Sequence, residues 1–163
     1  MKYHNITKDD MLNGEGLRVV LWVSGCEHHC PNCQNPITWD PNDGLLFDDD
    51  AVHEIQSLLS KSYISGLTLS GGDPLFPNNR NDIKDFIVYI KNQFPNKTIW
   101  MYTGYKWSEI KDLPVMKYID VIVDGKYIES LRDVNLPWRG SSNQRVIDVQ
   151  KSLEKGQIVL YCE

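Results

Sequence analysis

Short apolar runs alternate with amphipathic segments along most of this chain, and this alternation restricts the fold more than any other feature. The apolar runs are short and rich in β-branched or aromatic residues, which is typical of buried strands, and they lie at 18–24, 67–70, 98–103 and 118–123. The segments with helical spacing of apolar residues lie at 48–59, 82–94 and 107–113. Strands that alternate with helices indicate right-handed βαβ units around a parallel sheet.

The chain length limits how far such a sheet can close. The C-terminal part is less regular, and we expect strands at 145–149 and 157–162 on either side of a helical turn near Leu153. Four or five βα-type units are too few for a complete eight-unit barrel, which needs about 250 residues. No repeat or linker divides the 163 residues. We therefore predict one α/β domain over 1–163, a partial (β/α) barrel with a mainly parallel sheet and outer helices.

Charge and hydropathy exclude several classes of partner. The net charge is -5, and the sequence has no long basic stretch, so we expect no nucleic-acid substrate. Residues 1–10 are polar, and no apolar run approaches the roughly 20 residues that span a bilayer. We expect a cytoplasmic protein with no membrane segment. Three of the four cysteines are clustered. In a reducing compartment, such a cluster is more typical of a metal site than of a disulfide framework.

The clustered cysteines are Cys26, Cys30 and Cys33, in a C-x3-C-x2-C pattern. Thiolates select soft metals, which leaves an iron-sulfur cluster or zinc. Iron-sulfur clusters are ordinarily held by four cysteines, so three ligands leave one iron open to a substrate or cofactor.

Two alternatives would supply a fourth protein ligand and leave no open position at the metal. A zinc site needs a fourth ligand, and His28 or His29 would have to reach back from inside the same tight loop. We expect a solvent-facing or supporting role for these histidines instead. Cys162 is a possible distant fourth ligand, although a lone cysteine in an apolar segment is more typical of a small buried hydrophobic residue.

Unusual residues follow each of the predicted strands in turn. They occur at 26–33, 71–74, 103–104 and 124–126. In parallel α/β proteins the ligand-binding loops gather at the carboxyl ends of the strands, so we expect these four loops to line one mouth. The loop at 71–74 reads Gly-Gly-Asp-Pro, which suits either a tight turn or a close approach of the backbone to a ligand.

The cysteine loop and the Gly-Gly-Asp-Pro loop, in this order, resemble the radical S-adenosylmethionine superfamily. The resemblance implies a 4Fe-4S cluster on Cys26, Cys30 and Cys33, whose open iron chelates the amino and carboxylate groups of S-adenosylmethionine. It also implies that Gly71, Gly72 and Asp73 hold the amino group. Many members have Glu where this chain has Asp73, a change of one methylene that keeps the charge.

Further strings narrow the resemblance to one family within this superfamily. They are residues 13–18 (NGEGLR), 24–33 (SGCEHHCPNC), 69–75 (LSGGDPL), 102–105 (YTGY), 123–126 (VDGK) and 138–144 (WRGSSNQ). Together they resemble the activating enzymes of anaerobic ribonucleotide reductases. The resemblance implies reductive cleavage of S-adenosylmethionine, hydrogen abstraction by the 5′-deoxyadenosyl radical from a glycine of the large reductase subunit, and an external one-electron donor such as flavodoxin.

The resemblance also implies how the adenine is held. Related activating enzymes often have an aromatic residue beside the third cysteine, whereas Asn32 and Gln34 flank Cys33 in this chain. We therefore expect the backbone of Asn32, Cys33 and Gln34 to contact the adenine in place of a stacked side chain.

The remaining strand-end residues have two interpretations each. Thr103, Asp124 and Lys126 are expected contacts of the cofactor or of the substrate glycine loop, or else ordinary turn residues. Arg139 and the run at 141–144 are similarly a recognition segment or a hydrogen-bonded loop.

Two other functions remain open from the sequence. One is a different small radical S-adenosylmethionine enzyme that acts on a small molecule. The other is an interaction module that binds zinc or an iron-sulfur cluster without catalysis.

Overall fold

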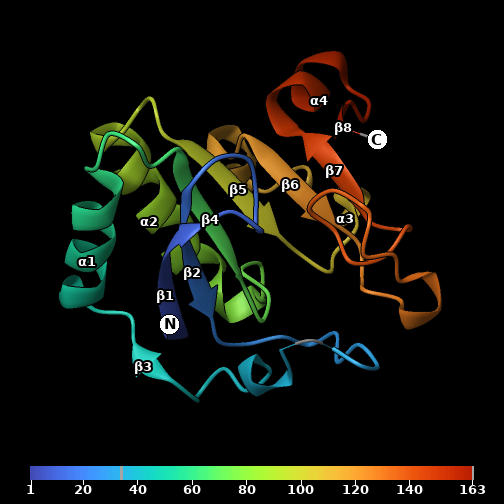
Figure 1. The fold of residues 1–163 in the computed structure, drawn as a ribbon, viewed down its shortest axis with the longest axis horizontal. Helices are drawn as coiled ribbons and strands as arrows, with labels where there is room; N and C mark the ends of the chain where they lie inside the picture. The colour runs from blue at the N-terminus through green and yellow to red at the C-terminus, as the bar shows by residue number, and fades with distance from the viewer. Residues whose placement is uncertain (34, 163) are drawn as a thin grey trace.

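A computed structural model describes residues 1–33 and 35–162, and within them eight strands form one sheet in the order β3-β1-β2-β4-β5-β6-β7-β8 (Figure 1). The strands are β1 (Lys2–Asp10), β2 (Arg18–Val23), β3 (Leu45–Leu46), β4 (Gly66–Gly71), β5 (Thr98–Tyr102), β6 (Val121–Asp124), β7 (Arg145–Asp148) and β8 (Leu160–Cys162). Strands β2, β4, β5 and β6 are parallel neighbours. The strands outside them pair in antiparallel fashion. A parallel centre with antiparallel edges matches the partial barrel predicted above.

The first three α-helices lie in the connections between the parallel strands, and the fourth lies between β7 and β8. The α-helices are α1 (Asp49–Leu59), α2 (Arg80–Gln93), α3 (Trp107–Ile110) and α4 (Val149–Lys155). The 3-10 helices are η1 (Pro36–Thr38), η2 (Pro77–Asn79), η3 (Pro114–Tyr118) and η4 (Glu129–Leu131). Helix α1 begins after Asp48, whose side chain accepts a hydrogen bond from the Ala51 N–H. No helix among the described residues is long and apolar enough to cross a membrane.

The two faces of the sheet bury different side chains, because successive residues of a strand point to opposite sides. On the helical face, Leu69 and Met101 pack with Ile55 of α1 and Ile87 of α2 in the main hydrophobic core. The opposite face carries a smaller buried cluster of Trp100, Val121, Val123 and Val146, against which Trp138 and Cys162 pack. Trp107 is buried in the main core, and Trp138 packs against the smaller cluster.

A buried guanidinium joins the amino ends of the parallel strands. Arg18 is fully buried, and its Nε donates to Thr68 Oγ1 at 2.8 Å, while one terminal nitrogen donates to the carbonyls of Leu67 at 3.0 Å and Thr98 at 2.8 Å. The ring of Trp100 lies 5.6 Å from the guanidinium carbon. Burial lowers the pKa of Arg18 to about 10, so the side chain stays charged at neutral pH. Arg18 therefore clamps β2, β4 and β5 together.

The secondary structure confirms most of the predicted elements, including the strand-helix-strand order of the C-terminal part. The last parallel strand begins at Val121 instead of residue 118, because the 3-10 helix η3 continues to Tyr118. Strand β1 was not predicted. Its sequence is mostly polar and only Tyr3 is buried, so it lacks the apolar pattern by which a strand is recognised.

Candidate active site

The cysteine loop leaves β2 at the carboxyl edge of the parallel sheet. Gly25 adopts a φ of 109°, which favours glycine, and its N–H donates to the Thr38 carbonyl at 2.7 Å. The N–H of Cys26 donates to the Trp39 carbonyl at 3.1 Å. These two bonds close the neck of the loop. Within it, His29 has a φ of 48°, a left-handed conformation that keeps the turn tight.

The three predicted ligands share this loop, and all three are free, half-buried thiols. The Cys33 N–H donates to the Cys30 carbonyl at 3.1 Å, so a turn joins these two cysteines. Burial raises the pKa of the Cys26 thiol to about 11, and the backbone N–H groups of His28 and His29 oppose the rise. Burial also raises the pKa of Cys30.

Some neighbouring groups favour negatively charged sulfur and oppose the larger effect of burial. The Asn35 N–H donates to Cys33 Sγ at 3.4 Å. The Tyr127 N–H and the Lys126 ammonium both favour the thiolate of Cys30. Hydrogen bonds to sulfur of this kind tune iron-sulfur clusters, and three soft thiolates with N–H donors fit such a centre. In the described part of the chain no three His, Cys, Asp or Glu side chains converge closely enough to hold a single metal ion.

The two glycines at the end of β4 allow the following loop to touch the neck of the cysteine loop. Gly71 has a φ of 108°, and its N-terminal neighbours run alongside β2. A Cβ on Gly72 would lie 2.4 Å from the Gly25 carbonyl oxygen and 2.7 Å from that of Thr38. The Asp73 N–H donates to the same Gly25 carbonyl at 2.7 Å. The glycines are therefore required for close contact between the two loops.

Asp73 is fully buried, and its carboxylate accepts hydrogen bonds from three loops. His28 Nε2 lies 2.6 Å from Oδ2, and Thr103 Oγ1 lies 2.9 and 3.0 Å from the two oxygens. The Gly104 N–H donates to Oδ2 and the Leu75 N–H to Oδ1, each at 2.9 Å. The cysteine loop and the loops after β4 and β5 thus meet at one carboxylate.

The sequence placed Asp73 and Thr103 at this mouth, but it did not reveal that they bind each other or that His28 joins them. The sequence showed only that His28 lies inside a short cysteine loop. A histidine in that position is compatible with several roles.

Asp124, at the end of β6, is also buried and held by protein groups. It accepts the Trp107 N–H at 2.8 Å, Arg145 Nε at 3.1 Å and an Arg145 terminal nitrogen at 2.6 Å. The hydrogen bonds from Arg145 raise the pKa of that guanidinium. Lys126, two residues further on, is exposed close to Cys30. Of these two predicted contacts, Lys126 has the side chain that faces solvent at the mouth.

The predicted recognition segment at 138–144 is tied to the loop after β6. Gln144 Oε1 accepts the N–H groups of Gly140 and Ser141 at 3.1 Å, and its Nε2 donates to the Gly125 carbonyl at 3.1 Å. Asn143 Nδ2 donates to the Lys126 carbonyl at 2.7 Å. These polar side chains form a hydrogen-bonded loop.

Two predicted adenine contacts can be placed. Asn32 is exposed and has a φ of 57°, and Cys33 follows it in the same turn. Gln34 lies outside the described residues. The roles of all three toward a cofactor stay predictions.

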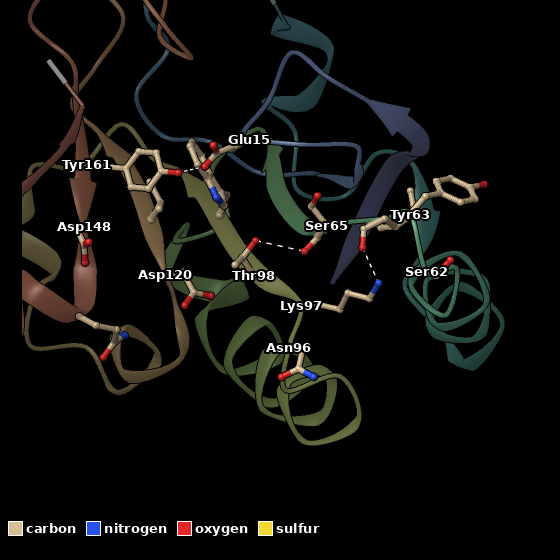
Figure 2. Close-up of a pocket in the computed structure, with 14 residues that line it drawn as sticks. Glu15, Ser62, Tyr63, Ser65, Asn96, Lys97, Thr98, Asp120, Asp148 and Tyr161 are labelled. Carbon is tan, nitrogen blue, oxygen red and sulfur yellow. Dashed lines mark hydrogen bonds between the residues drawn. The ribbon is translucent and has the colours of Figure 1, made fainter.

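A cavity of about 740 Å³ opens at the opposite edge of the sheet (Figure 2). It lies at the amino ends of β4, β5 and β6, and Thr98, Asp120 and Tyr161 are among its lining residues. Several of its polar groups are bound within the protein: Lys97 Nζ donates to the Ile64 carbonyl, and the Tyr161 hydroxyl donates to Glu15. The cysteine loop lies at the other end of the strands, so this cavity is separate from the candidate active site.

Comparisons with known proteins agree with an iron-sulfur site on the cysteine loop. Residues 12–147 match the model of a family described as a 4Fe-4S single cluster domain. An anaerobic ribonucleoside-triphosphate reductase-activating protein of Enterobacteria phage T4 is 52% identical over 146 residues, which are 90% of this chain and 93% of that protein. The protein of the same name from Haemophilus influenzae is 44% identical over 148 residues, 88% of this chain and 96% of that protein. Its counterpart in Escherichia coli K12 is 44% identical over 150 residues, 90% and 97% of the two chains. This chain therefore belongs to the family of anaerobic ribonucleoside-triphosphate reductase-activating proteins.

Proposed function

We propose that this chain activates an anaerobic ribonucleoside-triphosphate reductase by generating a glycyl radical on the large subunit of that enzyme. One observation carries the proposal: three thiols share one loop at the carboxyl edge of a parallel sheet, and that loop is bonded to the neighbouring strand-end loops. When bound, the cluster and S-adenosylmethionine supply the reductive cleavage of the cofactor and the abstraction of a hydrogen atom from the glycine.

The residues of this chain bind and orient these groups. Cys26, Cys30 and Cys33 would hold the cluster. The loop at 71–73 would hold the amino group of the cofactor, and the backbone at 32 and 33 would contact its adenine. Thr103, which is buried, orders the floor of the mouth, and the exposed Lys126 lies at its rim.

The family match supports this function over a zinc module, because residues 12–147 fit a family described as a 4Fe-4S single cluster domain. The contacts of the histidines do not separate the two kinds of site. His28 Nε2 lies 2.6 Å from Asp73, but a histidine that donates one ring nitrogen to a carboxylate can bind zinc through the other, and the stacking of His29 on Trp39 leaves its nitrogens available.

The test is anaerobic incubation of the reconstituted protein with reductant and S-adenosylmethionine, with and without the large reductase subunit. We expect about four iron and four sulfide per chain, and a glycyl-radical electron paramagnetic resonance signal only when the subunit is present. The Cys26→Ala variant should lose this signal. One zinc per chain without sulfide, or cofactor cleavage with no radical on the subunit, would contradict the proposal.

We further propose a flavodoxin as the one-electron donor and the cytoplasm as the location. The four free cysteines support a reducing compartment, where thiols persist. Reduced flavodoxin should replace a chemical reductant in the assay above, and failure to yield the radical with flavodoxin alone would count against this donor.

A further inference from the structure

His28 has a feature that cluster binding alone does not require. Its side chain is only 5% exposed, although it lies on a short loop between two half-buried cysteines. Its Nε2 lies 2.6 Å from the buried Asp73 carboxylate. An ionised carboxylate only accepts hydrogen bonds, so Nε2 carries the proton and donates it.

The loop after β5 is shaped to receive this imidazole. A Cβ on Gly104 would lie 2.5 Å from His28 Cδ2 and 2.7 Å from Nε2, so any other residue there would displace the ring. The Tyr105 ring packs edge-on against His28, with 4.5 Å between centroids and 70° between planes. The Tyr105 hydroxyl in turn donates to Glu27 on the cysteine loop. His28 is therefore enclosed by Asp73, Gly104 and Tyr105.

His28 also constrains a cluster ligand through the chain. It lies two residues after Cys26, whose own N–H donates to the Trp39 carbonyl at 3.1 Å at the neck of the loop. A fixed His28 side chain therefore restricts the short backbone segment that carries Cys26. Residues that hold a metal ligand in place influence both the geometry and the reduction potential of the centre.

We infer that His28 is a positioning residue, which holds the cysteine loop against the loops after β4 and β5 through Asp73 and Gly104 and so orients Cys26 toward the cluster. This inference rests on the proposed function only in that it assumes a bound cluster. The Asp73 carboxylate, which already accepts four protein donors, then serves to fasten the mouth of the site.

The experiment compares three variants of the reconstituted protein without the reductase. His28→Ala removes the donor, His28→Gln keeps a donor nitrogen at a similar reach, and His29→Ala changes the neighbouring histidine, which stacks on Trp39 instead. The readouts are iron and sulfide content, the electron paramagnetic resonance spectrum of the reduced cluster, its midpoint potential and the dissociation constant for S-adenosylmethionine.

For His28→Ala we expect an altered cluster spectrum, a shifted midpoint potential and cofactor binding about 10-fold weaker or more, a typical loss when a supporting contact of a metal site is removed. His28→Gln should restore the spectrum and most of the affinity. His29→Ala should change these readouts less than His28→Ala does, because its ring stacks on Trp39 and does not contact Asp73. If His28→Ala keeps the original spectrum, potential and affinity, the inference is wrong.

A second pair of variants tests the contact between His28 and Gly104. Gly104→Ala alone should disturb the cluster spectrum, because its Cβ would meet the imidazole. In the His28→Ala background the same change should have little further effect, so the two substitutions should be strongly non-additive. Additive effects would overturn the inference.

Two outcomes need separate interpretation. If His28→Ala loads no cluster, His28→Gln decides: a normal spectrum supports positioning, and a failure to load while His29→Ala loads normally contradicts it. A missing glycyl radical in the unmodified protein with the reductase would contradict the proposed function, while these measurements on the isolated protein would still test His28.

Discussion

At the scale of single residues, the candidate site depends on glycine positions that have no room for a Cβ. Gly72 illustrates this, because its position against the carbonyls of Gly25 and Thr38 leaves no room for a Cβ. The steric demand comes from backbone atoms, which cannot move aside as the end of a flexible side chain can. A substitution there must therefore separate the two loops that carry the site.

We predict that Gly72→Ala lowers the thermal midpoint of the reconstituted protein by about 3–9 °C, as expected for overpacking that costs about 1–3 kcal/mol. Cluster content should fall as well, because the neck of the cysteine loop moves. Gly140→Ala is the matched control, since its Cβ would meet side chains and no backbone atom within the three nearest contacts: Tyr127 at 3.1 Å and Gln144 Oε1 at 3.8 Å. Equal effects of the two substitutions would show that the contact with Gly25 is unimportant.

The sequence predicted where these residues lie better than it predicted which groups they contact. Cysteine spacing and strand-end position brought Cys26, Gly72 and Asp73 to the same mouth. The His28–Asp73 bond was not predictable, because it joins residues 45 positions apart and depends on how closely two loops approach. Residue type limits what a side chain can bind, whereas the packed backbone decides which partner it reaches.

At the scale of elements, the loop after β6 is fastened by Asp124. This buried carboxylate joins the end of β6 to the first residue of α3, Trp107, and to the first residue of β7, Arg145. It therefore connects α3, β6 and β7. Its contacts within the protein support the mouth of the site.

We predict that Asp124→Asn lowers stability more than it lowers cofactor affinity. The amide loses the ion pair with Arg145, and an incompletely bonded buried group costs about 1–3 kcal/mol. That cost should reduce the thermal midpoint by about 3–9 °C, while the dissociation constant for S-adenosylmethionine changes less than about twofold. Asp85→Asn, in an exposed pair with Lys84, is the control and should change little. A large loss of affinity at unchanged stability would instead make Asp124 a cofactor contact.

The elements themselves were predictable where the pattern was strong. The central strands are apolar on both faces, and α1 and α2 have clear apolar stripes, so each was recognised from its own residues. Strand β1 was missed because it is mostly polar and only Tyr3 in it is buried. Its place is decided by antiparallel pairing with β2, a contact that local sequence does not encode.

At the scale of the whole molecule, the sheet and the cysteine loop are separate parts of the structure. Among the described residues, the main core contains side chains from β2, β4, β5, α1 and α2 but none from 26–33. The loop is joined to this core by its neck at Gly25 and Cys26 and by the His28–Asp73 bond. The fold should therefore not depend on metal in the way that a small zinc domain does.

We predict that removal of iron leaves the sheet folded and loosens only the loop. Anaerobic chelation should leave the far-ultraviolet circular dichroism spectrum unchanged, and chymotrypsin should cleave faster after Trp39, which follows the loop. Cleavage after Trp100 and Trp107 should stay slow, because both side chains are buried in the protein. The Cys26→Ala variant, which removes a cluster ligand by an independent route, should show the same pattern. Loss of the spectrum, or early cleavage after Trp100, would mean that the cluster is needed to hold the sheet itself, since that residue lies on the central strand β5.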